Sequence, residues 1–312
     1  MSEVRIGTRA SALALTQARQ VKRMLEKRNP GVRFRLVTMK TFGDEFQGVE
    51  IFRKTNVGVF TKTIEKKLLS GGIDLAVHSL KDLPTALPGG LIVGAVPQRF
   101  PAQDVLLSRD RDRLIDLPWG ATVGTGSPRR KRQLLLRRPD LKVVDLRGNL
   151  ETRVAKVIQK KELDAVVIAH AGLLRMKKCL KFARVLSPKE MLPAVGQGAL
   201  AIELRASDKA ARRMVRKIHH DRTDKEVTAE RIFLGALQGG CRVPVGAYAR
   251  INKGTIFLKG AVFSVKTMDY VEDEIKAPVK KFKLIGRQLA ARLVKKGARR
   301  FLSEARRAES GA

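Results

Sequence analysis

The chain has 312 residues, which is enough for two or three domains of ordinary size, each with its own core. Its 44% hydrophobic and 5% aromatic residues are typical of a globular protein, and no apolar run is long enough to span a bilayer. The start of the chain lacks a basic segment and a cleavage site for export, so we expect a cytosolic protein. The two cysteines, Cys179 and Cys241, exclude a disulfide framework, and the spacing of the four histidines argues against a metal site.

The formal net charge of +34 indicates anionic partners or substrates. Nucleic acid is the first class to consider, but the basic residues are spread along the whole chain and hardly alternate with aromatic residues. Grooves that bind single strands without regard to sequence usually need such stacking partners. Nucleic-acid binding therefore rests on charge alone, and we rank it well behind binding of a small anionic substrate.

The chain begins with a predicted strand-turn-helix unit. Val4 to Gly7 has the composition of a strand, and apolar residues recur at helical spacing from Ser11 until residues 29–31 end the pattern. Thr8, Arg9 and Ser11 are expected in the turn between them. There, helix N-terminal amides and a guanidinium can hold a carboxylate.

The next predicted elements are a strand over residues 32–39, an irregular loop over 42–56 and a helix over 58–70. A short strand from Ile73 to Val77 follows, and four polar residues come at its carboxyl end: His78, Ser79, Lys81 and Asp82. In open α/β sheets this is the edge where ligands bind. For His78 the sequence leaves two roles open, a buried structural imidazole and a functional group.

A further strand is expected over residues 91–96, and the basic, proline-bounded segment 97–101 is the first predicted crossing between domains. A second series of strands follows, over residues 104–108, 121–124, 142–146 and 164–168. A turn of small residues follows each of the last three strands, at 125–127, 148–149 and 169–172.

Arginines recur at these strand-to-helix junctions. Ser127 is a good N-cap and Pro128 a good first helical residue, so Arg129 and Arg130 fall in the first turn, where cations oppose the helix dipole. This local conflict suggests a bound anion. The other residues at equivalent junctions are Arg147, Asn149, Arg153 and Arg175. We interpret Arg132, Arg137 and Arg138, farther along the same helix, as solvated surface residues.

The rest of the chain predicts a return crossing and a terminal domain. Glycines punctuate residues 191–199, which suits the second crossing, and a strand over 200–204 follows. Helices over 222–237 and 279–296 enclose three strand-like segments, as expected for a compact α+β domain. The last residues are expected to form a basic helix end and a solvated tail. The predicted domains are 1–98 with 199–217, 103–192 and 221–312.

The motifs together resemble the porphobilinogen deaminase (hydroxymethylbilane synthase) family over essentially the whole length. The six motifs, in family order, are Ile6-Gly-Thr-Arg-Ala-Ser11, Ala76-Val-His-Ser-Leu-Lys-Asp82, Gly126-Ser-Pro-Arg-Arg130, Leu146-Arg-Gly-Asn149, Leu192-Pro-Ala-Val-Gly-Gln-Gly-Ala199 and Gly239-Gly-Cys241. Each is weak alone, and all six in order are a specific signal.

The resemblance implies two α/β domains of the type II periplasmic-binding-protein kind around a cleft, plus a smaller α+β domain. It also implies a dipyrromethane cofactor attached to Cys241 through a thioether, whereas Cys179 is expected to pack in a partly buried place. On this primer the family adds four porphobilinogen units with loss of ammonia, and hydrolysis releases hydroxymethylbilane. Members of the family are usually monomeric.

The resemblance also assigns the site residues. Asp82 matches the catalytic carboxylate, which assists loss of the amine, stabilises the resulting cation and helps to remove the α-proton after coupling. Because every pyrrole carries an acetate and a propionate, arginines suit the growing chain. The matched cofactor-binding residues are Cys241, Lys81, Ser79, Ser127, Arg129, Arg130 and Asn149. The matched substrate-binding residues are Arg9, Ser11, Arg147, Arg153 and Arg175.

This sequence departs from the family pattern in three places. Val57 replaces a lysine that typically helps to hold the cofactor's carboxylates, with Arg53 and Lys54 close enough in sequence to compensate. Gly126 stands where a serine is common, and Ala12 where proline is usual. These changes affect loop contacts more than the reaction. The alternative is a non-catalytic anion-binding protein of the same architecture, which would need the arginines but neither Asp82 nor Cys241.

Overall fold

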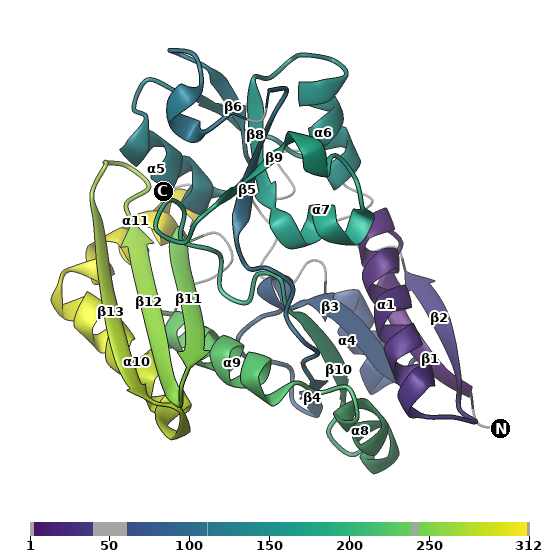
Figure 1. The fold of residues 1–312 in the computed structure, drawn as a ribbon. Coiled ribbons are helices and arrows are strands. Elements are labelled where there is room, and N and C mark those ends of the chain that lie inside the picture. The colour runs from purple at the N-terminus through teal and green to yellow at the C-terminus, as the bar shows by residue number, and fades with distance from the viewer. Residues whose placement is uncertain (1–2, 40–60, 111, 239–242, 311–312) are drawn as a thin grey trace. The chain divides into compact units, whose positions relative to one another are not determined.

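The computed structural model describes residues 3–39, 61–110, 112–238 and 243–310. The chain divides into two compact units, residues 1–100 with 199–224 and residues 101–198 with 225–312 (Figure 1). The unit boundaries fall after residues 100 and 198, inside the segments expected to cross between domains. The finer division of the second unit, into 103–192 and 221–312, stays a prediction.

The first unit contains a five-stranded sheet with helices on both faces. The strands, in spatial order, are β2 (Arg33–Met39), β1 (Glu3–Arg9), β3 (Leu75–Ser79), β10 (Leu200–Arg205) and β4 (Leu91–Ala95). β1 is parallel to β2 and β3, whereas β10 runs antiparallel to both of its neighbours.

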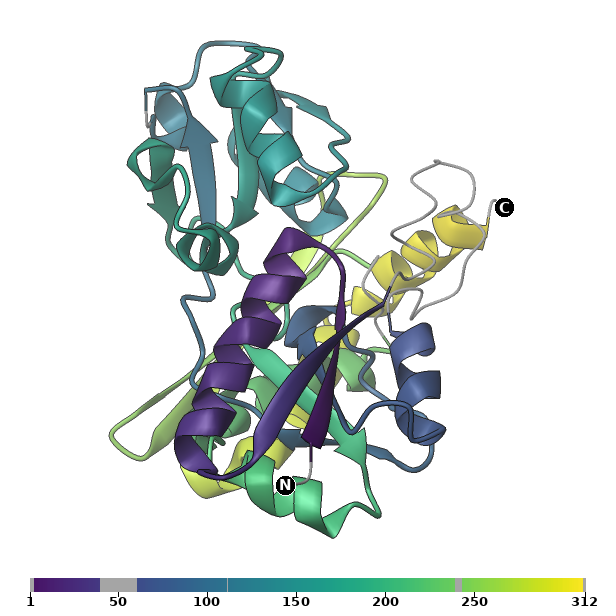
Figure 2. The ribbon, with the colours of Figure 1, turned by 90° about the vertical axis from the view of Figure 1, so that its right-hand side faces the viewer.

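Three helices cover this sheet because each has one apolar face. α1 (Ala12–Arg28) and α8 (Lys209–Arg216) pack in one core with the strands, and α1 lies along β1 and β2 (Figure 2). α4 (Lys62–Leu69) packs Ile64 and Leu68 against Ile73 and Ala76 in a separate core. Alternate residues of β3 therefore face different helices.

The second unit contains a sheet with the same topology. Its order is β7 (Lys142–Val144), β6 (Thr122–Gly124), β8 (Ala165–Ala169), β5 (Asp104–Ser108) and β9 (Ala183–Leu186). β6 is parallel to β7 and β8, and β5 is antiparallel to β8 and β9. In both sheets the antiparallel fourth strand is the first strand after a crossing segment. Two such α/β domains of the type II periplasmic-binding-protein kind confirm the predicted fold class.

The helices of this sheet are α5 (Pro128–Arg137), α6 (Leu150–Ile158) and α7 (His170–Met176). Leu134 of α5 lies in one apolar cluster, and Val154 of α6 and Leu173 of α7 lie in another. The sheet is thus covered on both faces, and the strand-to-helix junctions lie at its carboxyl edge.

A small α+β part completes the second unit. It has an antiparallel meander of β11 (Val245–Asn252), β12 (Thr255–Phe263) and β13 (Tyr270–Pro278) (Figure 1). Its helices are α10 (Phe282–Lys295), α11 (Ala298–Ser310) and residues 225–236 of α9 (Asp221–Ala236). A Cβ on Gly286 would lie 2.5 Å from the Ala229 carbonyl oxygen, so this glycine allows α10 to pack closely on α9.

Several elements differ from their predicted extents. β1 continues through Arg9 and β3 through Ser79, so these residues end strands instead of starting turns. α7 forms where a turn was predicted, and α8 was not among the predicted helices. The prediction of a solvated tail was wrong for α11, whose Phe301 and Leu302 are buried in the terminal core.

Within the described ranges, no helix is both long and apolar enough to cross a membrane. The described residues also contain no cluster of His, Cys, Asp and Glu side chains suited to holding a metal ion. The predicted loop over 42–56 lies outside the described residues, as do Val57 and Cys241.

Candidate functional site

Asp82 ends a short 3-10 helix that follows β3 directly. The backbone of this turn, Leu80–Asp82, is held in place by two features. Leu80 and the following Leu83 are buried, and the Leu80 amide donates to the Ala199 carbonyl at 3.0 Å. Lys81 is half-buried, and Asp82 is exposed. The structure thus holds the Asp82 carboxylate in solvent contact on an anchored backbone.

Ser79, the last residue of β3, is held by α1. Its Oγ lies 2.9 Å from Nε2 of Gln17, a buried glutamine of that helix. Because β1 and β3 are parallel neighbours, Arg9 at the end of β1 lies at the same sheet edge as Ser79 and Asp82. Ser11 caps α1, with its Oγ accepting from the Ala14 amide at 3.4 Å. The site residues predicted in the first unit therefore share one sheet edge.

His78 points to the other face of β3. Its Nε2 lies 3.0 Å from Oε2 of Glu203 on β10, and both side chains are buried. This contact beneath α4 supports the structural role for His78 that the sequence had left open.

Arg129 and Arg130 bind a carboxylate of the chain itself. Asp104, fully buried at the start of β5, accepts from Arg129 Nη2 at 2.8 Å and from Arg130 Nη2 at 2.7 Å. Gln197 donates to the same carboxylate at 2.8 Å and to the Ala102 carbonyl at 2.7 Å. Backbone carbonyls of Leu192 and Val167 take further N–H groups of the two arginines. The Asp104 carboxylate therefore supplies negative charge at the first turn of α5, where the sequence predicted a bound anion.

This network ties the second crossing segment, and the residues just after the first, to α5. Burial alone would raise the pKa of Asp104, but Arg129 and Arg130, together with hydrogen bonds from Arg130 and Gln197, lower it to about 2. Asp104 and Gln197 were not among the predicted site residues. The sequence offered two weak signals for them. Asp104 is an acidic residue at the start of an otherwise apolar strand, and Gln197 lies in a glycine-rich motif.

We expect Asp104→Asn to destabilise the fold by about 3–5 kcal/mol, because two buried guanidinium groups would lose their counter-ion. Denaturant unfolding measures the loss, and Asp145→Asn, at an exposed aspartate 3.2 Å from Arg147, is the matched control.

The wild type should also lose stability as the pH falls from about 4 to about 2. The reason is that the folded pKa lies below the unfolded one, so protonation favours unfolding. The free energy of unfolding of Asp104→Asn should lack this dependence on pH. If the variant lost as much stability between about pH 4 and about pH 2 as the wild type, the dependence would not arise from Asp104.

Arg153 and Arg175 are cations in surroundings that disfavour their charge. Burial lowers the pKa of Arg153, and the positive charge of Arg130 lowers it further. Burial lowers the pKa of Arg175 to about 10, while its Nη2 donates to the Gly198 carbonyl at 2.9 Å. A bound carboxylate would offset these costs, so the donor set fits a polycarboxylate such as a dipyrromethane.

The remaining predicted residues lie at the starts of α5 and α6. Ser127 Oγ accepts from the Arg130 amide at 3.4 Å, and Asn149 Oδ1 accepts from the Thr152 amide at 2.8 Å, so both are N-caps. Arg147 is exposed, 3.2 Å from Asp145. Since β6, β7 and β8 are parallel, these junctions share the carboxyl edge of the second sheet. Roles in ligand binding for these residues stay predictions.

The interpretation of Arg138 as a solvated residue was wrong. It is 8% exposed, pairs with Asp140 at 2.6 Å and donates to the carbonyls of Leu114, Leu117 and Pro118. It therefore fixes the loop before β6, a role that no local pattern in the sequence indicates.

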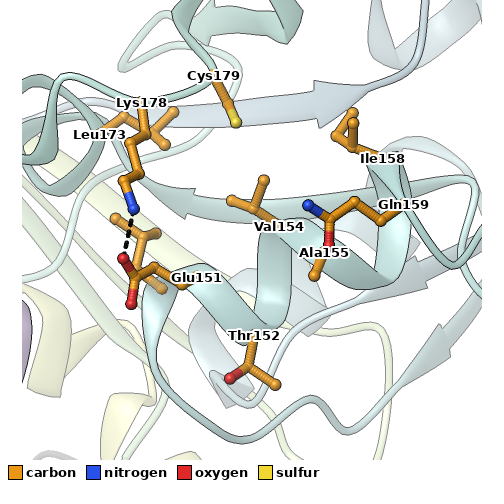
Figure 3. A pocket seen from close by; sticks show the side chains of 10 residues that line it. Glu151, Thr152, Val154, Ala155, Ile158, Gln159, Leu173, Lys178 and Cys179 are labelled. Atoms are coloured by element: carbon orange, nitrogen blue, oxygen red, sulfur yellow. Dashed lines mark hydrogen bonds and ion pairs between the residues drawn. The ribbon is translucent and has the colours of Figure 1, made fainter.

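A pocket of about 360 Å³ lies in the second α/β domain beside α6 (Figure 3). Leu150, Val154, Ile158 and Leu173 give it an apolar lining, and Lys178 pairs with Glu151 at its rim. Cys179 lines it and is half-buried, as predicted for a packing residue. The apolar lining does not suit a polycarboxylate, so the pocket is no alternative to the strand edges.

Two family models match the chain. "Porphobilinogen deaminase, dipyromethane cofactor binding domain" covers residues 4–213, and "Porphobilinogen deaminase, C-terminal domain" covers residues 225–295. The chain is 44% identical over 311 residues to a porphobilinogen deaminase of Moorella thermoacetica, covering 100% of this chain and 99% of that protein. It is 42% identical over 305 residues to one of Carboxydothermus hydrogenoformans, covering 98% of each. The chain therefore belongs to the porphobilinogen deaminase family.

Proposed function

We propose that this enzyme polymerises porphobilinogen with Asp82 as its catalytic carboxylate and Cys241 as the attachment residue of its dipyrromethane cofactor. The family match supports the activity and the cofactor over nearly the whole chain. What supports Asp82 is its place: an exposed carboxylate on an anchored turn, at the same sheet edge as Arg9 and Ser11. No observation favours the non-catalytic alternative.

Asp82 meets the requirements of the reaction. Loss of ammonia from the aminomethyl group of porphobilinogen leaves a cationic, electron-poor carbon, and a carboxylate beside it stabilises that charge. The same group can protonate the leaving amine and accept the α-proton after coupling, because each step needs one acid or base within hydrogen-bond reach. Lys81 is next to Asp82 in sequence and is proposed to hold a carboxylate of the cofactor.

The arginines divide into two groups by their surroundings. Arg153 and Arg175 are proposed to bind ligand carboxylates directly. Burial disfavours the charged form of both side chains, and a bound carboxylate would stabilise that form. Arg129 and Arg130 are proposed to contribute mainly through the Asp104 network, with donors left over for the cofactor. When bound, the cofactor supplies a primer whose terminal pyrrole carries the free position for coupling. Ser79, Ser127 and Asn149 are proposed to orient it.

The test is a mass measurement combined with an activity assay. Protein purified from a host that makes porphobilinogen should be heavier than its sequence by one dipyrromethane, and it should release ammonia as it consumes porphobilinogen. A protein at the bare sequence mass that still consumes the substrate would refute the covalent primer. We further propose that the enzyme is a cytosolic monomer, which gel filtration and cell fractionation can test.

A further inference from the structure

A basic groove lies on the first unit, between strand β4 and helix α8. It has a volume of about 510 Å³ and is lined by Ile92, Val93 and Gly94 of β4 and by Lys209, Arg212, Arg213 and Arg216 of α8. A Cβ on Gly94 would lie 2.5 Å from Leu204 Cδ2 and 3.1 Å from Val215 Cγ2, so the missing side chain lets α8 approach the strand. None of these residues belongs to the proposed site.

The four cations carry a large surplus of positive charge. All four are exposed and stand on two turns of one helix. Among the described residues, the ion pair that they make joins Arg216 to Asp221 at 3.3 Å, on the surface. Asp208, the nearest carboxylate in sequence, is committed to capping α8 and to Arg205. Mutual repulsion of four close cations is relieved by an anionic partner.

The floor of the groove is a sheet edge. β4 is the last strand in the order β2-β1-β3-β10-β4, and it pairs with β10 on one side. Its sequence, Leu-Ile-Val-Gly-Ala, contains no charged residue and no proline. Proteins commonly place such residues on edge strands to prevent pairing with another chain. Here the charges come from α8 and have one sign. They repel other copies of this basic chain and attract an acidic strand.

We propose that this groove docks an extended, acidic segment of a partner protein, which adds as a strand to the free edge of β4. Main-chain hydrogen bonds to β4 would give affinity, and alternate acidic side chains would contact the cations of α8. A nucleic acid fits less well, because no aromatic side chain lines the groove for base stacking and the strand edge offers it nothing. The proposal does not depend on the proposed catalytic roles.

The probe for the test is a capped, fluorescent peptide of alternating glutamate and valine. We expect salt-sensitive binding, seen by anisotropy, and slower hydrogen exchange at the amides of β4 when the peptide is present. The double variant Arg212→Glu/Arg213→Glu should weaken binding by about tenfold or more, because it reverses the charge of the groove. The matched control is Lys280→Glu/Lys281→Glu, which changes the net charge equally at exposed positions of the other unit and should weaken binding by less than about threefold. Both variants should retain porphobilinogen consumption, which shows that they are folded.

Three outcomes would overturn the proposal. Equal weakening by the control variant would show that net charge alone attracts the peptide. Binding without protection of the β4 amides would exclude strand addition. Tighter, groove-dependent binding of an oligouridylate of the same length would identify a nucleic-acid surface instead.

Discussion

Cys241→Ser is expected to yield a protein at its bare sequence mass that does not polymerise porphobilinogen. A thiolate is the nucleophile that forms the thioether, and a serine hydroxyl remains protonated and unreactive at neutral pH. Without the covalent primer, the growing chain has no attachment point. Mass spectrometry of the purified variant and a porphobilinogen consumption assay measure the two effects together.

Cys179→Ser is the matched control for this experiment. Cys179 is half-buried beside the apolar pocket of the second α/β domain, and its role there is packing. This variant should carry the added mass and keep its activity. Added mass in Cys241→Ser that disappears in Cys179→Ser would transfer the attachment to the other cysteine.

Asp82→Asn is expected to lower kcat by about 10²–10⁴ with little effect on stability. The amide has nearly the shape of the carboxylate but cannot take up a proton or neutralise the cation that forms when ammonia leaves. The fold should tolerate the change, because Asp82 is exposed and its turn is fixed by Leu80 and Leu83. Single-turnover kinetics on the cofactor-loaded variant separate the chemical step from loading of the primer.

Asp116→Asn gives a close structural control. Asp116 is also an exposed aspartate at the third position of a short 3-10 helix, Leu114–Asp116, whose first leucine is buried. It lies in the other unit and pairs with Arg113. Its variant should stay within about twofold of wild-type activity. Comparable losses in both variants would indicate a general effect of the substitution and argue against a chemical role for Asp82.

The local chemistry of the chain was predictable wherever neighbouring residues decide it. Ser11, Ser127 and Asn149 cap their helices, as short polar residues before helical patterns do. The alternation of strands and helices predicted both α/β sheets, and the six motifs predicted the family that the comparisons show. Strand ends were less predictable. Arg9 extends its strand because it pairs with Met39 of the parallel strand β2, and Ser79 because it pairs with Leu200 of the antiparallel strand β10. Local periodicity carries no information about such pairing.

The fate of each charge was decided by tertiary structure. The sequence indicated that an anion should lie near Arg129 and Arg130, because cations at a helix start are unfavourable, and it could not indicate that Asp104 would provide one. In sequence, Arg138 resembles the exposed arginines of the chain. In the structure it is buried, and it donates to backbone carbonyls of a loop about 20 residues earlier in the chain.

Sequence alone thus determined the fold class, the family and the polar residues at the carboxyl ends of the strands, since these depend on local pattern and on motif order. Only the tertiary structure decided which of those residues are anchored, buried or exposed. It gave His78 a buried partner on β10, left Asp82 in solvent and placed four cations of α8 beside β4, the last strand of its sheet in the described part of the chain. The physical reason is that burial and charge pairing depend on residues far apart in the chain, whose distances the fold alone sets.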